Sequence, residues 1–329
     1  MYTHTNFTQN ELDGALKILE KCGNFSPFEH TVVVFDAQTK SVANCFSEAA
    51  QSLGGNVLLV ETPPAKMHGE EPSSAAAQAI LDADLVLGLR NKSMAHTNAR
   101  LAMTKNGGRY LSLPDYTLEL LNDPSLQVDY TAQFKNVLAI SDELTKGSKI
   151  CVVTEAGTEI QMDAAGRFGN CCPGFVKNKG DLGSPPDIEA NISPLENSAN
   201  GVIVVDGSIP FTGFGLLNKP ITLEIKDGKI SKISGNQRDV DKLDVLFASH
   251  GDSKSRILAE CGVGLNPAAK LTGVMLTDEG SLGTIHFGFG SNSTVGGINE
   301  IAFHIDFVCR AATLSVDGNV IIQKGQIKL

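Results

Sequence analysis

The sequence has no run of apolar residues long enough to cross a membrane. A spanning helix needs about 18 or more consecutive apolar residues, and none occurs although 42% of the 329 residues are hydrophobic. The start of the chain, Met1 to Asn6, also lacks the basic and apolar regions of a secretory signal. We therefore predict a soluble protein that stays in the cytoplasm.

Cysteines at metal-ligand spacing are missing as well. The seven cysteines are odd in number and contain no C-x-x-C pair. This pattern indicates free thiols in a reducing compartment, and it disfavours a metal site built from thiolates. They are Cys22, Cys45, Cys151, Cys171, Cys172, Cys261 and Cys309.

The chain also has little positive charge. Its 27 basic residues are outnumbered by 37 acidic ones, giving a net charge of −10. Nucleic acids and anionic membranes are normally met by basic patches, so we predict neither as a partner. The carboxylate surplus is explained by solubility or by cation binding, and composition leaves both open.

The length predicts two domains, which we place at residues 1–128 and 129–329. In the first, short apolar runs alternate with helical patterns, as in βαβ units with a parallel sheet. We predict a Rossmann-like α/β domain. No G-x-G-x-x-G turn follows its first strand, so nucleotide binding is not indicated. The predicted strands are 31–35, 57–60, 85–89 and 110–113, and the predicted helices are 40–52, 73–83 and 95–105.

The second domain is predicted to be a β-rich α+β domain that binds metal. Short apolar stretches are separated by the turn signals Asp206-Gly207, Asp227-Gly228 and Asp317-Gly318. Such Asp-Gly pairs favour hairpins and hence antiparallel strands. One helix is predicted near residues 239–248.

Three segments of this domain carry candidate metal ligands. Side chains alternate along a strand, so His304 and Asp306 of an H-x-D pattern would share one face. A salt-bridged structural histidine would give the same pattern. His286 lies in a glycine-rich β segment eighteen residues earlier (304 − 286), and Glu260 comes directly before a G-x-G-x-N-P turn. Imidazole and carboxylate ligands suit Zn, Co, Mn or Fe(II).

These segments together resemble a known family. A-E-C-G-V-G-L-N-P, G-T-I-H-F-G-F-G and H-I-D are similar to motifs of the thermophilic metalloproteases, aminopeptidases T and S. They are equally similar to motifs of shorter relatives, the 2,5-dihydroxypyridine dioxygenases. In the first domain, residues 68–72 and 93–100 resemble segments of the same relatives.

The aminopeptidase resemblance implies one or two metal ions and a homodimer. The implied ligands are two glutamates, two histidines and an aspartate, with the second glutamate matching Glu189. Glu196 is a competing carboxylate nearby, and Ser293 stands where the peptidases have a tyrosine. The implied ligand set is Glu189, Glu260, His286, His304 and Asp306.

The dioxygenase resemblance implies a different metal site. Those relatives hold iron with two histidines and one carboxylate, and their first histidine falls where this chain has Glu260. The iron ligands could then be His286, His304 and Asp306.

We weigh three functions. The favoured one is metal-dependent hydrolysis of an amide or peptide-like bond in a small molecule or short peptide, with metal-activated water as nucleophile. Glu189 or Glu196 would relay the proton, and the resemblance adds His96 as a further acid or base. The alternatives are a mononuclear Fe(II) dioxygenase that opens a small hydroxylated N-heterocycle, and an inactive binding protein of the same fold.

Overall fold

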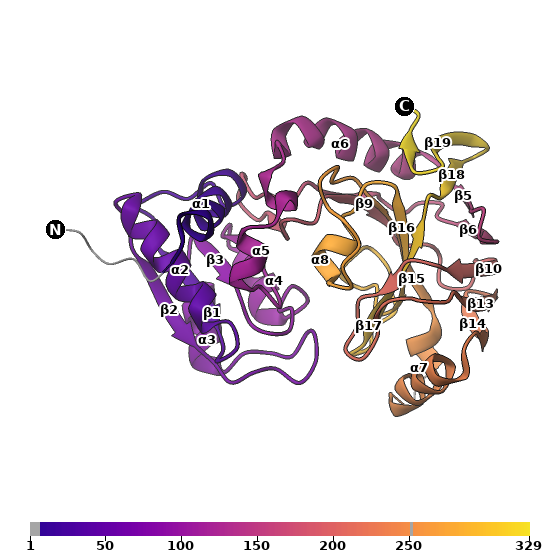
Figure 1. Ribbon diagram of the computed structural model, residues 1–329, viewed down its shortest axis with the longest axis horizontal. Helices are drawn as coiled ribbons and strands as arrows, with labels where there is room; N and C mark the ends of the chain where they lie inside the picture. Colours follow the sequence, from indigo (N-terminus) through magenta and orange to yellow (C-terminus); the bar gives the residue numbers. More distant parts are fainter. Residues whose placement is uncertain (1–6, 251–252) are drawn as a thin grey trace. The chain divides into compact units, whose positions relative to one another are not determined.

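The computed structural model describes residues 7–250 and 253–329, which form two compact units. Of the described residues, those up to 130 and 174–185 form unit 1, and those of 131–173 and from 186 onward form unit 2. The order of strands and helices along the chain can be followed in Figure 1. No helix within the described residues is long and apolar enough to cross a membrane.

Unit 1 is a Rossmann-like α/β unit, as predicted. Its five parallel strands lie in the order β2-β1-β3-β4-β8. The core on one face contains Val32 and Val86 from the sheet, with Ile80 and Met103 from the helices. The strands are β1 (Thr31–Phe35), β2 (Val57–Glu61), β3 (Leu85–Gly88), β4 (Arg109–Ser112) and β8 (Leu182–Gly183).

Several helices of unit 1 begin at side-chain caps that the sequence supplies. Ser73 accepts a hydrogen bond from the amide of Ala76, and Thr97 accepts one from Arg100. Such caps satisfy amides that the first helical turn leaves without partners. The helical elements are α1 (Gln9–Lys17), η1 (Ile18–Cys22), α2 (Lys40–Ser52), α3 (Ser74–Leu81), α4 (Asn98–Lys105), α5 (Leu118–Leu121) and η2 (Pro124–Gln127).

Unit 2 contains two antiparallel sheets. The eight-stranded sheet has the order β14-β13-β10-β6-β5-β18-β19-β20, and the seven-stranded sheet has the order β12-β11-β17-β16-β15-β9-β7. The first comprises β5 (Lys149–Val153), β6 (Glu159–Asp163), β10 (Asn200–Val205), β13 (Ile221–Lys226), β14 (Lys229–Ser234), β18 (Thr313–Val316), β19 (Asn319–Gln323) and β20 (Gln326–Ile327). The second comprises β7 (Asn170–Cys172), β9 (Glu189–Ile192), β11 (Ser208–Ile209), β12 (Gly215–Leu216), β15 (Leu258–Gly264), β16 (Thr284–Gly290) and β17 (His304–Arg310).

Two of the three Asp-Gly signals form hairpins. Asp227-Gly228 joins β13 to β14 and Asp317-Gly318 joins β18 to β19, all four residues having positive φ. The hairpin expected at Asp206-Gly207 is wrong, because β10 and β11 belong to different sheets. The chain passes from the eight-stranded to the seven-stranded sheet there, and it passes in the opposite direction between β17 and β18. A hydrogen bond links these two crossing segments, because the amide of Arg310 donates to the Asp206 carboxylate.

The remaining helices of unit 2 include one that the sequence analysis missed. The predicted helix near 239–248 is α7 (Gln237–Ser249). The long helix α6 (Tyr130–Lys146) was not predicted, although Val137, Ile140 and Leu144 recur at helical spacing and are fully buried. The shorter elements are η3 (Ser253–Arg256) and α8 (Met275–Asp278).

Candidate metal centre

All five predicted ligands lie on four adjacent strands of the seven-stranded sheet. Glu189 is on β9, Glu260 on β15 and His286 on β16, while His304 and Asp306 are both on β17. In the register, Asp306 and Glu260 are each paired with Gly288 of the strand between them. Paired residues of neighbouring strands project from the same face of a sheet, so these side chains share one face.

Glycines on the neighbouring strands make room for the imidazoles. Gly262 is paired with His286, and a Cβ at this glycine would overlap the imidazole ring. A Cβ at Gly288 would lie 2.6 Å from Nε2 of His304 and 2.9 Å from Oδ1 of Asp306. Sequence reasoning missed this role, although the alternating glycines of G-V-G after Glu260 and G-F-G after His286 could have indicated it.

The two oxygens of Glu260 face different histidines. Its Oε1 lies 3.9 Å from Nε2 of His286, and its Oε2 lies 3.5 Å from Nε2 of His304. On the outer sides, His286 Nε2 lies 3.1 Å from Oε2 of Glu189, and His304 Nε2 lies 3.1 Å from Oδ1 of Asp306. Glu260 is therefore the central carboxylate of the cluster.

Within the described residues, two groups could hold a metal ion. One is Glu189, Glu260 and His286, and the other is Glu260, His304 and Asp306, with ligand atoms within 4.8 Å of one another in each group. The alternative iron triad of His286, His304 and Asp306 is not one of these groups. Glu260 takes the third position beside the H-x-D pair instead.

The electrostatics of the cluster fit a bound cation. Burial opposes the charged form of both histidines, but neighbouring carboxylates outweigh it. Asp306 and then Glu260 raise the pKa of His304 to about 9, and Glu189 contributes most to raising the pKa of His286 well above its ordinary value. The buried carboxylates thus favour positive charge at both imidazoles. A divalent ion would balance the same charge and leave the imidazoles free to bind it.

Two further buried acids border the cluster. Burial, followed by the nearby carboxylate of Glu189, raises the pKa of Asp187 well above its usual range. Burial and then Asp306 do the same for Glu279. One oxygen of each acid has no hydrogen-bond partner within the described structure. Neither residue is among the ligands predicted from the sequence.

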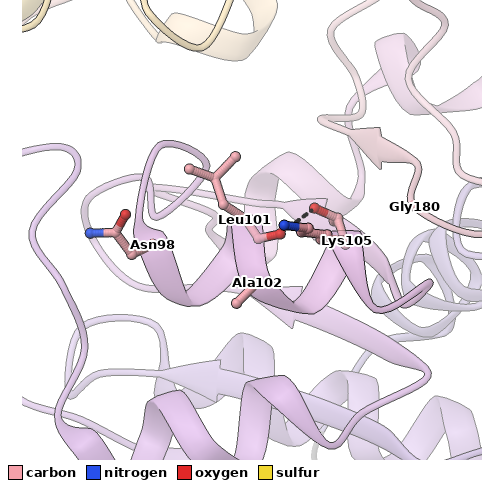
Figure 2. A pocket seen from close by; sticks show the side chains of 6 residues that line it. Asn98, Leu101, Ala102, Lys105 and Gly180 are labelled. Atoms are coloured by element: carbon pink, nitrogen blue, oxygen red, sulfur yellow. Dashed lines mark hydrogen bonds between the residues drawn. The ribbon is translucent and has the colours of Figure 1, made fainter.

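The two other predicted acid/base residues lie elsewhere. Glu196 contacts Arg167, Asn292 and the amide of Ile298, and it belongs to neither metal-binding group. His96 is exposed in unit 1, in the turn before α4. The exposed face of α4 lines a hollow, shown in Figure 2, together with Gly180.

The two motif segments of unit 1 are bonded to each other. The amide of Ser93 donates to Nδ1 of His68 at 3.2 Å, and the amide of Gly69 donates to the carbonyl of Ser93 at 2.9 Å. The Asn91 side chain exchanges hydrogen bonds with the backbone of Ala65. These bonds join segments 65–69 and 91–93 into one ordered pair of loops.

The comparison with family models decides which family this chain belongs to. The model of NicX, 2,5-dihydroxypyridine 5,6-dioxygenase, matches residues 14–329. The chain belongs to the NicX family. As a NicX-family protein it is a metalloenzyme, and the resemblance noted from its motifs is confirmed. No curated protein matches the chain.

Two solved structures share the NicX-family chain's fold. The 2,5-dihydroxypyridine dioxygenase from Pseudomonas putida KT2440 has 23% identity and a TM-score of 0.82, over 98% of both chains. AmpT from Thermus thermophilus has 14% identity and a TM-score of 0.72, over 98% of this chain and 100% of AmpT. At these identities the likenesses establish the fold alone.

The favoured prediction of a metal-dependent hydrolase is wrong. The NicX model covers nearly the whole chain, whereas the peptidase likeness is a similarity of fold at 14% identity. The carboxylate of Glu260 does not by itself favour hydrolysis, because carboxylate and imidazole ligands suit ferrous iron as well as zinc. The prediction of a metal centre in the second half of the chain did not depend on that choice.

Proposed function

We propose that this NicX-family protein is a mononuclear Fe(II) dioxygenase that opens the ring of a small hydroxylated N-heterocycle. The observation that carries the proposal is the family match across residues 14–329. The grouping of Glu260, His304 and Asp306 supports it, because carboxylate and imidazole ligands suit ferrous iron. The family name makes 2,5-dihydroxypyridine the first substrate to test.

We assign the iron to Glu260, His304 and Asp306, with one ion per chain. When bound, ferrous iron supplies the redox chemistry that activates O2. The Ser291 carbonyl accepts from Nδ1 of His304 at 2.9 Å, which leaves Nε2 as the ligand atom. Glu189 and His286 would orient Glu260 from the side opposite His304. The resulting set has one imidazole fewer than the two-histidine, one-carboxylate pattern of the relatives.

The proposed reaction is balanced without a further reductant. A 5,6-dioxygenase breaks the ring bond between carbons 5 and 6 and adds one oxygen atom of O2 to each carbon. The four electrons that O2 accepts come from the substrate. The chain must therefore hold the ring beside the metal centre and accept or return protons at the ring hydroxyls.

The test is O2 consumption by anaerobically purified protein loaded with one equivalent of Fe(II). With 2,5-dihydroxypyridine we expect equimolar loss of O2 and of the aromatic absorbance, no ring loss under argon, and no activity with Zn or Co. Fully iron-loaded protein that consumes no O2 would overturn the proposal. Protein that neither binds Fe(II) nor gains stability from it would favour the inactive binding protein.

We further propose that the protein is a cytoplasmic homodimer with no nucleic-acid or membrane partner. The seven cysteines, all free, support a reducing compartment. Only the family resemblance supports the dimer. Sedimentation equilibrium at several protein concentrations tests it, and a monomer mass throughout would contradict it.

A further inference from the structure

The loop of residues 291–299, between β16 and β17, begins at a hydrogen bond to the metal centre. The carbonyl oxygen of Ser291 can only accept, so the 2.9 Å contact with Nδ1 of His304 requires the proton on Nδ1. Nε2 then faces Asp306 and Glu260, at 3.1 Å and 3.5 Å. The start of the loop therefore sets both the tautomer and the ring orientation of a metal ligand.

The middle of the loop is connected to the opposite side of the centre. The Nδ2 group of Asn170 donates to the carbonyl of Val295 at 3.0 Å and to Oδ1 of Asn191 at 2.7 Å. The Nδ2 group of Asn191 in turn donates to Oε1 of Glu189 at 2.7 Å. Two asparagines thus link the loop to Glu189. The same loop is therefore connected to His304 on one side of the cluster and to Glu189 on the other.

Glu196 and Arg167 hold this loop in place. One terminal nitrogen of Arg167 lies 2.8 Å and 3.0 Å from the two oxygens of Glu196, and the other donates to the carbonyl of Gly296. Oε1 of Glu196 also accepts from the Asn292 side chain at 2.9 Å and from the Ile298 amide at 2.8 Å. The loop is fixed at three points by one ion pair.

The carboxylate of Glu196 is fully engaged in these contacts. Both side chains of the pair are largely buried, with exposed fractions of 11% for Arg167 and 17% for Glu196. Burial alone would raise the pKa of Glu196, but the amide of Ile298, then Asn292 and Arg167, outweigh it and lower the pKa. These contacts favour the ionised form of the carboxylate, and they occupy the oxygens that a proton relay would use.

We propose that Glu196 and Arg167 are positioning residues that set the metal affinity through the 291–299 loop. Charge-assisted hydrogen bonds fix the loop, and the loop fixes the assigned ligand His304 and, through two asparagines, Glu189 beside it. The inference rests on the metal centre of the proposed function but not on the ring-opening reaction. Glu196 acts through other residues and does not touch the ion.

The test compares Glu196→Gln with the matched control Glu224→Gln. Glu224 pairs with Lys232 on the exposed surface of β13 and β14, at 2.9 Å. The readouts are Co(II) affinity by equilibrium dialysis and the visible absorption spectrum of the bound Co(II). We expect Glu196→Gln to weaken binding about 10- to 100-fold, as is typical for outer-shell partners of metal ligands. We also expect it to change the spectrum, while Glu224→Gln does neither.

A folded Glu196→Gln protein with wild-type Co(II) affinity and spectrum would overturn the proposal. If that variant does not fold, Arg167→Lys keeps the charge and loses the forked donor geometry, and the same loss of affinity is expected. Wild-type affinity in Arg167→Lys would then overturn it. Dialysis requires neither O2 nor substrate, so the two proposals can fail separately. If iron-loaded wild-type protein is inactive but Glu196→Gln still weakens Co(II) binding, the proposed function is refuted and this inference stands.

Discussion

The imidazole of His286 occupies the space that a side chain at Gly262 would need. The two residues are paired across β15 and β16, and a Cβ at Gly262 would overlap the ring. An imidazole can lie this close to a neighbouring strand only where that strand has no side chain. The glycine is thus part of the metal centre although it offers no ligand.

Gly262→Ala is expected to displace His286 and weaken metal binding. Forcing a methyl group into a filled site costs about 1–3 kcal/mol of stability. Metal affinity and urea unfolding of the metal-free protein measure the two effects. Cys261→Ala is the control, because Cys261 is the neighbour of Gly262 in the chain and its side chain projects from the other face of β15. Equal metal affinities of Gly262→Ala and wild type would contradict the prediction that the position of the His286 ring affects metal binding.

Glu260→His is expected to retain Fe(II), whereas Glu260→Ala is expected to lose it. The dioxygenase resemblance implies a histidine at this position, and a histidine here keeps a third ligand beside His304 and Asp306. Alanine leaves two ligands. Iron content after gel filtration distinguishes the variants. A Glu260→Ala protein with one full equivalent of iron would contradict the assignment of Glu260 as a ligand.

The stability of the metal-free protein is expected to fall as the pH rises toward 9. The folded protein raises the pKa of His304 to about 9, from about 6.5 in the unfolded chain. Its contribution is therefore complete below about pH 6.5 and is lost as the pH passes through 9. Urea unfolding with a chelator at pH 6 and pH 9.5 measures the difference. His304→Gln should reduce the dependence of the unfolding free energy on pH. An unchanged pH dependence in that variant would show that other groups cause it.

Metal removal is expected to lower the melting temperature. An ion present at 100 times its Kd stabilises the folded state by about 2.7 kcal/mol. Each kcal/mol shifts the melting temperature of a folded domain of about 150–250 residues by roughly 2–4 °C. Calorimetry before and after chelation measures the shift. Adding Fe(II) back should restore the higher melting temperature. An identical melting curve with and without metal would argue against a metal site in the folded protein.

His96→Gln is expected to lower kcat without changing the metal content. General acid–base groups contribute about 10²- to 10⁴-fold to the rate, and His96 is the histidine that the family resemblance suggests for proton transfer. Steady-state kinetics with iron-loaded protein test this. A kcat within twofold of wild type would remove His96 from the list of acid/base candidates.

The sequence alone determined the local elements and the choice of ligand segments. Periodicity located β1 to β4 and helices α2, α3, α4 and α7, because alternation and helical spacing are properties of short segments. The same alternation placed His304 and Asp306 on one face of a strand. Asp-Gly signals located two hairpins for the same reason, since a two-residue turn needs only its own backbone geometry.

The tertiary structure decided everything that depends on contacts between distant segments. It paired Leu182–Gly183 with β4, sent the chain from one sheet to the other at Asp206-Gly207, and bound Glu196 to Arg167 and the 291–299 loop. Spacing along the chain carries no information about such pairings. The sequence could therefore name the candidate ligands, but only the tertiary structure could show that Glu260 stands between the two histidines.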